Sequence, residues 1–252
     1  MNGLTTTLNP PSQVGDALVT EAWTFRLRHA DLQEHVDPTD DFARFSSHVR
    51  SPGGTLAVLR QSDGTLVGMV HFRVLCRVYE GRSVRIVAPE YGFVDPAFRS
   101  TGWTGIVCAR MFLRLAGPSP RRSGYVAGPA YLPSYLSTCR ALPTVWLAGD
   151  PNIPLFEQGL MHSIAGELFG DAFDEDTGLV ELPTRPRMPE EGRTPLGASS
   201  QSARLHYLQT NPDWARGSAA FMMAPLTLSG YAIGTSKTIK RRSLSSFRRA
   251  SR

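Results

Sequence analysis

The sequence has little cysteine: Cys76, Cys108 and Cys139 are the three cysteines in 252 residues, and no two form a C-x-x-C pair. Without that spacing we expect neither a disulfide framework nor a zinc site. An odd number of cysteines, far apart in the sequence, is typical of a protein in a reducing compartment. We therefore expect a cytoplasmic protein. The six histidines also lack a metal-ligand spacing such as H-E-x-x-H, and we predict no metal site.

The sequence also lacks a secretory signal and a long apolar run. Residues 1–15 have neither a basic region nor an apolar stretch, and we expect a flexible leader there. Residues 217–236 carry no formal charge, but glycine, proline, serine and threonine interrupt them. A buried strand over 219–224 followed by a helix is therefore expected rather than a membrane span, and contact with a membrane is at most peripheral.

Acidic residues are absent from the C-terminal tail. Residues 237–252 carry seven of the 27 Lys and Arg residues, which leaves 20 basic against 22 acidic residues in the rest of the chain. A nucleic-acid-binding fold needs basic charge on a folded face, so we do not expect nucleic acid as a partner of the domain. The tail itself is either a solvated segment or a contact for an acidic protein, nucleic acid or an anionic membrane.

Hydrophobic periodicity divides the rest of the chain into helices and strands. Helices are predicted over 16–36, 39–50, 104–116, 134–142, 155–169 and 199–209. Strands are predicted over 55–61, 65–79, 83–94, 123–127 and 178–182. Residues 183–198 hold four prolines and are predicted to be a loop. This order indicates a three-layer α/β fold with a mixed, largely antiparallel central sheet and a helical C-terminal extension.

The stretch Glu90–Gly105 is the most informative, because it joins the strand at 83–94 to the helix at 104–116. Backbone N–H groups at a helix N-terminus can hold phosphate oxygens, Gly102 allows close approach, and Arg99 adds positive charge. The predicted phosphate cradle consists of Arg99, Ser100, Thr101, Gly102, Trp103 and Thr104. The alternative is an ordinary turn between a strand and a helix.

Glu90 is the candidate general base. Strict alternation places it on one apolar face with Val84, Ile86, Gly92 and Val94. Such a face would raise the pKa of the carboxyl group toward neutrality, which suits a base. Pro89 predicts a bulge that re-aims Glu90. The alternative is a carboxylate that faces solvent or pairs with an arginine.

The run from Phe93 to Gly105 resembles the central motif of the GNAT superfamily of N-acetyltransferases, in which a strand is followed by Arg/Gln-x-x-Gly-x-Gly/Ala and a helix. Arg99 and Gly102 match this motif, and Thr104 departs from it. The segments 21–28, 36–42 and 66–73 are similar to the acyl-homoserine-lactone and N-acyl amino acid synthase branch. The resemblance covers residues 18–145.

The resemblance implies an acyltransferase that moves an acyl group from a thioester donor to an amine by direct attack. The donor would be acyl-coenzyme A or acyl-phosphopantetheine on acyl carrier protein, bound as a co-substrate, with no tightly bound cofactor. It would lie between the strands at 83–94 and 123–127, flanked by Phe93 and Val94, where a backbone N–H polarises the carbonyl. The acceptor would be a small-molecule or peptide amine.

The resemblance also implies roles for other side chains. Tyr131 and Tyr135 follow the strand at 123–127, where a tyrosine would protonate the leaving thiolate; Tyr135 is preferred, and aromatic packing is the alternative. An acceptor site would be shaped by Arg26, Arg28, Asp37 and Asp40, with a solvated helix face as the alternative. Structural roles are expected for His29, His71 and Cys108.

The chain is therefore expected to contain a leader (1–15), an acyltransferase-like core (16–150), a C-terminal half that completes the sheet or forms a lid (151–236), and the basic tail (237–252). Two other classes of function stay open. One is a non-catalytic binding or regulatory protein on a decayed acetyltransferase fold. The other is an adaptor that acts through the basic tail.

Overall fold

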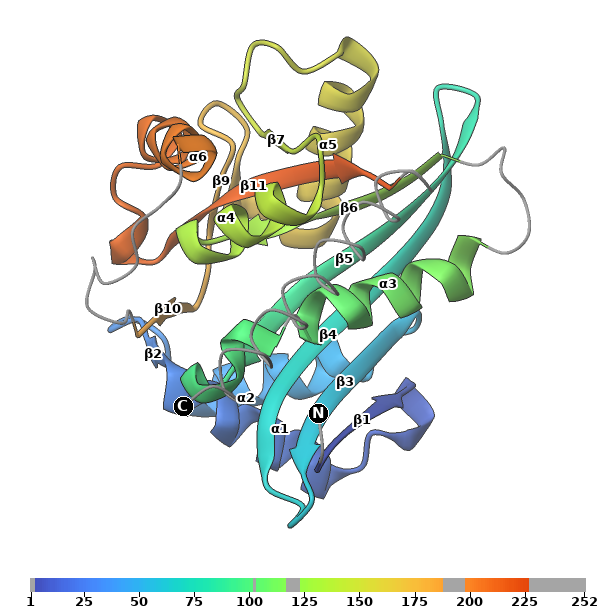
Figure 1. Ribbon diagram of the computed structural model, residues 1–252, viewed down its shortest axis with the longest axis vertical. Helices are drawn as coiled ribbons and strands as arrows, with labels where there is room; N and C mark the ends of the chain where they lie inside the picture. The colour runs from blue at the N-terminus through green and yellow to red at the C-terminus, as the bar shows by residue number, and fades with distance from the viewer. Residues whose placement is uncertain (1–2, 102, 117–122, 188–197, 227–252) are drawn as a thin grey trace, which may run out of the picture.

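A computed structural model describes residues 3–101, 103–116, 123–187 and 198–226 (Figure 1). Its strands are β1 (Leu4–Asn9), β2 (Ala30–Leu32), β3 (Gly54–Gln61), β4 (Leu66–Tyr79), β5 (Arg82–Val94), β6 (Ser123–Ala130), β7 (Trp146–Leu147), β8 (Phe173–Asp174), β9 (Leu179–Glu181), β10 (Thr184–Pro186) and β11 (Ser218–Pro225). Its α-helices are α1 (Asp16–His29), α2 (Pro38–Val49), α3 (Trp103–Ala116), α4 (Leu132–Ala141), α5 (Leu155–Phe169) and α6 (Ala198–Thr210). Short 3-10 turns are η1 (Pro11–Gln13), η2 (Pro96–Thr101), η3 (Gly170–Ala172) and η4 (Trp214–Arg216).

One sheet runs through the molecule in the order β1-β3-β4-β5-β6-β11-β9-β8, and β7 also pairs with β11. Within the described residues, every ladder of this sheet is antiparallel except the parallel one between β5 and β6. A small second sheet pairs β2 with β10. The predicted mixed α/β fold with a largely antiparallel central sheet is confirmed.

Helices α1, α2 and α5 cover one face of the sheet. Phe25 of α1 and Phe45 of α2 pack with Leu56 and Met69 of the sheet. Farther along the same face, Leu160 of α5 belongs to a second buried cluster that spans β5, β6 and β11. Burial of these apolar faces stabilises the layers by roughly 25 cal/mol per Å² of apolar surface removed from water.

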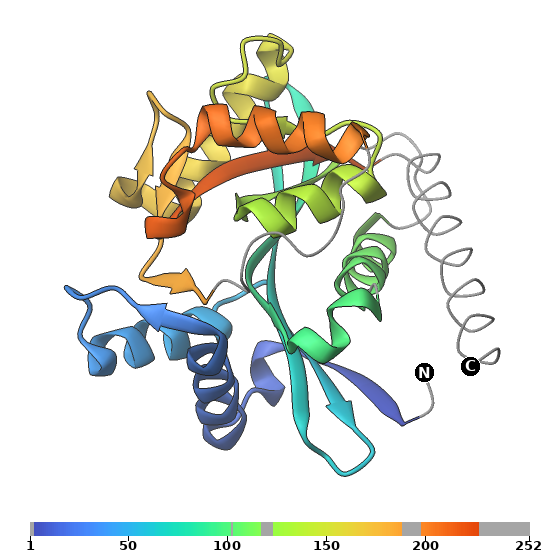
Figure 2. The same ribbon diagram turned by 60° about the vertical axis from the view of Figure 1, so that its left-hand side comes forward.

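Helix α3 covers the opposite face, as Figure 2 shows. Trp103 and Val107 of α3 pack against Phe72 of β4 and Val87 of β5. Helices α4 and α6 form another buried cluster with β6 and β11. The sheet therefore has helices on both faces, which explains why β5 is apolar on both sides over much of its length.

Helix α2 begins at Pro38, one residue before the predicted start at residue 39, and Asp37 is its N-cap. The side chain of Asp37 accepts hydrogen bonds from the backbone N–H groups of Thr39 at 2.7 Å and Asp40 at 3.2 Å. Pro38 occupies the first turn, where its missing N–H leaves no helical bond unmade. Helix α1 ends at His29 rather than at residue 36, because the next residues form β2.

Several segments without a strong local signal also join the sheets. Leu4–Asn9 lies in the expected flexible leader, but forms β1 and pairs along its whole length with β3. Thr184–Pro186 lies in the expected loop, but forms β10 against β2. By contrast, β9 and β11, which extend the main sheet, correspond to the strands predicted at 178–182 and 219–224.

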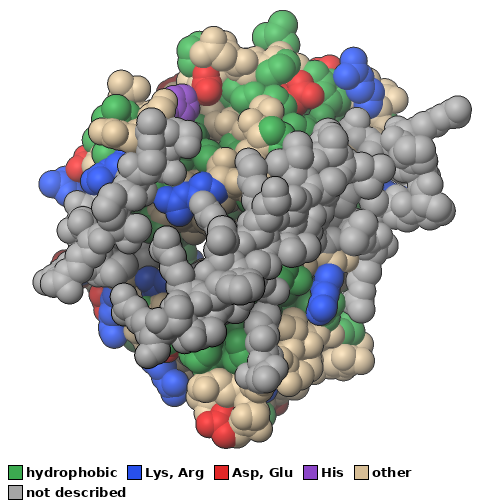
Figure 3. All heavy atoms as spheres, in the orientation of Figure 1, with side chains coloured by type: hydrophobic (Ala, Val, Ile, Leu, Met, Phe, Trp, Pro, Cys, Tyr) green, Lys and Arg blue, Asp and Glu red, His purple; other side chains and the backbone are tan. Residues whose placement is uncertain are grey.

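No helix in the described part of the chain is long and apolar enough to cross a membrane. The predicted strand at 219–224 is β11, whereas the expected helix after it and the basic tail at 237–252 lie outside the described residues. On the face in Figure 3, the visible described basic side chains lie in separate groups among hydrophobic and acidic ones.

Candidate functional site

Glu90 lies at a β-bulge between β4 and β5, as predicted from Pro89. His71 pairs with Tyr91 and Phe72 pairs with Pro89, so the register shifts and Glu90 has no opposite residue in β4. The extra residue breaks the strict alternation along the strand. Glu90 is thereby directed onto the face that carries His71.

Because of the bulge, the residues after Glu90 lie on a different face of the sheet from the one predicted. Gly92 pairs with Val70, and Val94 packs with the cluster beneath α3, so both belong to the opposite face from Glu90. Ile86, which precedes the bulge, packs on the α5 side of the sheet. The expectation that Gly92 and Val94 share a face with Glu90 is wrong because it assumed an unbroken strand.

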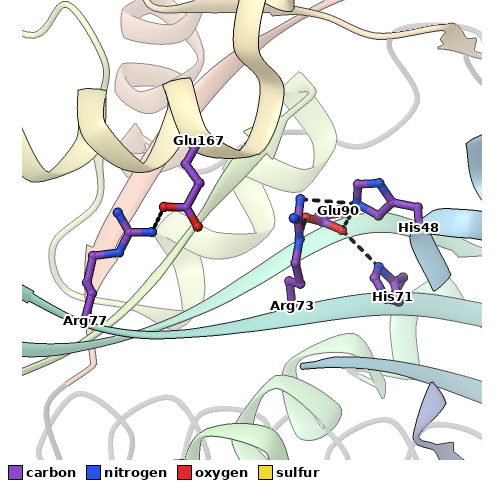
Figure 4. A network of polar contacts seen from close by, with 6 residues as sticks. All are labelled: His48, His71, Arg73, Arg77, Glu90 and Glu167. Carbon is purple, nitrogen blue, oxygen red and sulfur yellow. Dashed lines mark hydrogen bonds and ion pairs between the residues drawn. The ribbon is translucent and has the colours of Figure 1, made fainter. Parts of the chain in front are cut away.

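A network of polar side chains holds the Glu90 carboxylate (Figure 4). Its Oε2 is bonded to His48 Nε2 from α2 and to His71 Nδ1 from β4, the latter at 3.0 Å. Arg73 Nε of β4 donates to Oε1 at 2.7 Å. The side chain of Glu90 is only 2% exposed, so these three groups replace the water that the carboxylate would otherwise bind.

The pKa of Glu90 is lowered, and the upward shift expected from the sequence is wrong. Burial alone would raise the pKa, but the hydrogen bonds from His48 and His71 outweigh it and lower the pKa to about 2. Glu90 is therefore a carboxylate at neutral pH. Its low basicity makes it a poor direct proton acceptor.

The carboxylate fixes the protons on the two histidines. A carboxylate only accepts hydrogen bonds, so His48 Nε2 and His71 Nδ1 each carry a proton. Burial lowers the pKa of His71 and outweighs the opposing effect of Glu90, so this ring is neutral. Its Nε2 is then a buried nitrogen without a hydrogen-bond partner in the described structure.

The same three side chains form a possible metal donor set, which the sequence spacing did not reveal. Their ligand atoms, His48 Nε2, His71 Nδ1 and a Glu90 oxygen, lie within 4.8 Å of one another. Arg73 opposes a cation there, because its Nε binds Glu90 and its Nη2 lies 3.3 Å from His48 Nε2. A bound divalent ion would face this guanidinium at close range, so the donor set does not fit a metal in this arrangement.

The second part of the candidate site is the opening between β5 and β6. Their parallel ladder runs from Val84↔Ser123 to Val87↔Val126 and stops there, although β5 continues to Val94. The strands stay close just beyond the ladder, since a Cβ atom at Gly128 would lie 2.7 Å from the Pro89 carbonyl oxygen. Past that contact, the edge of β5 facing β6 lacks a ladder partner in the described residues.

The predicted phosphate cradle lies between β5 and α3. Arg99 is exposed, and its Nε donates to the Val94 carbonyl at 3.0 Å. Trp103 turns its ring into the core beneath α3, and its Nε1 donates to Thr6 Oγ1 at 3.0 Å. Thr104 is exposed. Gly102 and the side chains of Ser100 and Thr101 lie outside the described residues.

The residues predicted to flank the thioester and the two candidate tyrosines are less exposed than Arg99 and Thr104. Phe93 packs partly against the α1–α2 cluster, whereas Val94 packs on the α3 side. Tyr135 is buried 5.3 Å from the ring of Tyr207, and burial raises its pKa. Burial also raises the pKa of Tyr131, whose hydroxyl donates to the Thr184 carbonyl at 2.6 Å.

The candidate acceptor residues do not form one cluster. Arg26 is fully buried and pairs with Asp41, a residue that the sequence did not single out. Asp37 instead caps α2, and Arg28 is exposed. The contacts of Arg26 and Asp37 support a role for both in holding α1 and α2 in place.

Sequence reasoning missed His48 and Arg73 as partners of Glu90, and it treated His71 as structural. One signal was available: His71 and Arg73 fall on the polar face of the strand at 65–79. No local pattern shows that His48, 42 residues from Glu90, reaches the same point.

Comparisons with known proteins give weak structural likenesses. No protein-family model and no curated protein matches the chain. Among solved structures, an acetyltransferase of the GNAT family from Staphylococcus aureus Mu50 matches with 12% identity and a TM-score of 0.38, over 60% of this chain and 89% of that one. The aminoglycoside 6'-N-acetyltransferase AAC(6')-Ih from Acinetobacter baumannii matches with 15% identity and a TM-score of 0.36, over 54% and 86%.

A third similar structure is a protein from Enterococcus faecalis V583 named "Probable N-Acyltransferase", with 15% identity and a TM-score of 0.37. That match covers 53% of this chain but only 32% of the Enterococcus protein. At such identities and TM-scores these likenesses carry no inference about chemistry, which has to come from the residues themselves.

Proposed function

We propose that this protein is an acyltransferase that moves an acyl group from a thioester donor to an amine. The observation that carries the proposal is the end of the β5–β6 ladder at Val87↔Val126, beside the bulge that holds Glu90. This arrangement puts an unpaired strand edge next to a buried, charged hydrogen-bonding network. A chain of amides, such as the pantetheine arm of coenzyme A or of a carrier protein, can bond to such an edge as a strand would.

The turn after β5 supplies the expected contact for the donor phosphates. Helix α3 begins directly after it, and the positive end of a helix dipole favours an anion. Arg99 is exposed at this end and can also approach a phosphate. In this proposal Phe93 and Val94 flank the thioester, and a backbone N–H of β5 polarises its carbonyl.

The leaving thiolate is proposed to take its proton from Tyr135 or from solvent. Tyr135 is buried and burial raises its pKa, so its hydroxyl is a weaker acid than a free tyrosine and solvent is the readier source of the proton. A fatty acyl group on acyl carrier protein is the narrower proposal for the donor, and acetyl-coenzyme A is the competing one. The three free thiols suit the proposed cytoplasmic location.

The test combines donor binding with turnover. Thermal shift is measured with coenzyme A, acetyl-coenzyme A, a long-chain acyl-coenzyme A and acylated carrier protein, and thiol release is followed with a panel of amines. Arg99→Glu should weaken binding of the donor, because it places a negative charge at the cradle. Arg110→Glu makes the same charge change at an exposed position farther along α3 and should leave binding unchanged.

The pattern of results separates the donors and the function classes. Binding of acylated carrier protein alone selects the carrier, and binding of acetyl-coenzyme A alone selects the short acyl group. Binding without thiol release from any amine favours a regulatory protein. If none of the thioesters binds, or if Arg99→Glu weakens binding no more than Arg110→Glu does, the proposed donor site is refuted.

A further inference from the structure

Resting on the proposed function, we infer that His48 is the proton acceptor for the amine and that Glu90 is a positioning residue behind it. Of the two imidazoles and the carboxylate in the network, His48 has the side chain most in contact with solvent. Its side chain is 23% exposed, whereas those of His71 and Glu90 are 0% and 2% exposed. A substrate can therefore reach His48, but neither of the other two.

The hydrogen bond to Glu90 sets which nitrogen of His48 is basic. His48 Nε2 faces the carboxylate and holds a proton, so the neutral ring has its lone pair on Nδ1. Nδ1 has no hydrogen-bond partner among the described residues. The carboxylate also stabilises the imidazolium that forms when Nδ1 takes a second proton, as in other carboxylate–histidine pairs.

Several charges act on the His48 ring from the elements around it. Glu90 of β5 favours its protonated form, and so does the C-terminal end of α2, where His48 occupies the last turn. Arg73 of β4 disfavours it, with Nη2 at 3.3 Å from Nε2. His71 is neutral, and the Tyr91 ring packs edge-on at 5.5 Å between centroids. The His48 ring thus faces one carboxylate and one guanidinium, together with the C-terminal end of α2.

The proposed reaction balances without a covalent enzyme intermediate. His48 Nδ1 takes one proton from the ammonium group, and the free amine attacks the thioester carbonyl carbon. The C–N bond forms, the C–S bond breaks, and the thiolate leaves with the electron pair. The second proton of the attacking nitrogen passes to the thiolate, while His48 returns its proton to solvent.

The two histidines offer a matched pair of variants. In His48→Gln the amide nitrogen can replace Nε2 as the donor to Glu90, and in His71→Asn the amide can replace Nδ1. Both variants keep a bond to the carboxylate and remove one ring. Circular dichroism and donor thermal shift establish that each variant folds and binds the donor like the wild type.

The pH profile of kcat then tests the assignment. We expect the wild-type kcat to fall as pH is lowered and His48 becomes protonated, whereas His48→Gln loses roughly 10²-fold in kcat and also loses this dependence. His71→Asn should keep the dependence. In Glu90→Gln the fall should move to lower pH, because the negative charge that favours the imidazolium is gone. An unchanged profile in His48→Gln, or its loss in His71→Asn, would overturn the inference.

A measurement without turnover separates this inference from the proposed function. Nitrogen-15 NMR of the imidazole groups, assigned with the two variants, reports which nitrogen of neutral His48 carries the proton. A proton on Nε2 supports the inference, and a proton on Nδ1 overturns it, whether or not a thioester is consumed. Stoichiometric zinc binding that is lost in both His48→Gln and His71→Asn would also overturn it, because the network would then be a metal site.

Discussion

The Glu90→Gln variant should be less stable than the wild type at neutral pH, and this difference should vanish in acid. The substitution keeps the size of the side chain but removes the negative charge that three donors surround. The neutral amide resembles the protonated carboxyl group, so the variant imitates wild-type Glu90 below its pKa. Histidine protonation acts on both proteins and partly cancels in the comparison.

The size of this difference in the free energy of unfolding follows from the pKa of Glu90. It falls from an ordinary value of 4.5 to about 2 in the folded protein, which corresponds to about 3 kcal/mol at 1.36 kcal/mol per pH unit. Because the folded pKa is depressed, this stabilisation is fully present above pH 4.5. It is lost as the pH falls toward 2, when the folded protein also binds the proton.

The assay is urea unfolding of both proteins at pH 7, 5, 4 and 3, followed by tryptophan fluorescence. We expect the variant to unfold with a free energy about 3 kcal/mol lower at pH 7 and 5, and the gap to narrow at pH 4 and 3. A gap that does not change with pH would refute the reasoning, since a mere packing defect has no such dependence. Equal stability at pH 7 would show that burial of the charge outweighs its three hydrogen bonds.

Two further substitutions test close contacts at the candidate site, and a third tests a buried hydrogen bond to β11. Gly54→Ala should displace the His71 ring, because the new Cβ would lie 2.7 Å from Nε2, and both kcat and stability should fall, the latter by about 1–3 kcal/mol. Gly128→Ala should force β5 and β6 apart at the Pro89 carbonyl, with a similar loss of stability and weaker donor binding. Asn211→Ala should cost about 1–3 kcal/mol, because the buried amide bonds the backbone of β11 at 3.0 Å. Urea unfolding and donor thermal shift measure all three.

Gly166→Ala in α5 is the control for the two glycine substitutions. Nothing lies within 4 Å of its new Cβ, so the variant should be more stable by about 0.5–1 kcal/mol through its higher helix propensity. Gly54→Ala or Gly128→Ala with wild-type stability would show that the neighbouring groups move freely. A wild-type unfolding curve for Asn211→Ala would show that water satisfies the backbone of β11.

Local sequence signals predicted most of the helices and strands well. The bounds of α5, Leu155–Phe169, agree with the prediction, and β3, β4 and β5 begin and end within one residue of it. These elements are long and periodic, and turn residues bound them, so their own residues carry the information. Helix α1 was overextended because β2 continues the apolar spacing without a breaker.

The elements that were missed depend on distant partners. Leu4–Asn9 is rich in threonine and has no marked alternation, and it becomes a strand by pairing with β3 some fifty residues later. Strand β10 includes Pro186, which local rules assign to a loop or a sheet edge, and it pairs with β2. The strand propensity of such segments is decided by the tertiary structure.

In the candidate site, too, the features with a local sequence signal could be predicted and those that depend on distant residues could not. Glu90 and the bulge at Pro89 could be predicted, because a charged residue and a proline stand out in an apolar strand. The charge state of Glu90 could not, because it depends on His48 from α2 and on the side of β4 that carries His71 and Arg73. A carboxylate on an apolar strand predicts a raised pKa, but hydrogen bonds from His48 and His71, on two other elements, reverse that shift.

The β5–β6 ladder has a consequence for the order in which the protein folds. It comprises four residue pairs, Val84↔Ser123 to Val87↔Val126, and forms only after the chain has crossed over through α3. The partner on the other side of β6 is β11, ninety residues beyond it at Ala130↔Ala220. By contrast, β3, β4 and β5 join through hairpins, which close short loops and form early.

The groups around Glu90 all come from α2, β4 and β5, on the early-forming side of this seam, whereas the proposed donor opening needs both sides. Slow steps in assembling the C-terminal strands should therefore delay donor binding after the histidine–glutamate network is already in place. On this reasoning the four-pair seam separates two expected folding events: one that assembles the proposed proton-handling groups, and a later one that completes the proposed donor opening.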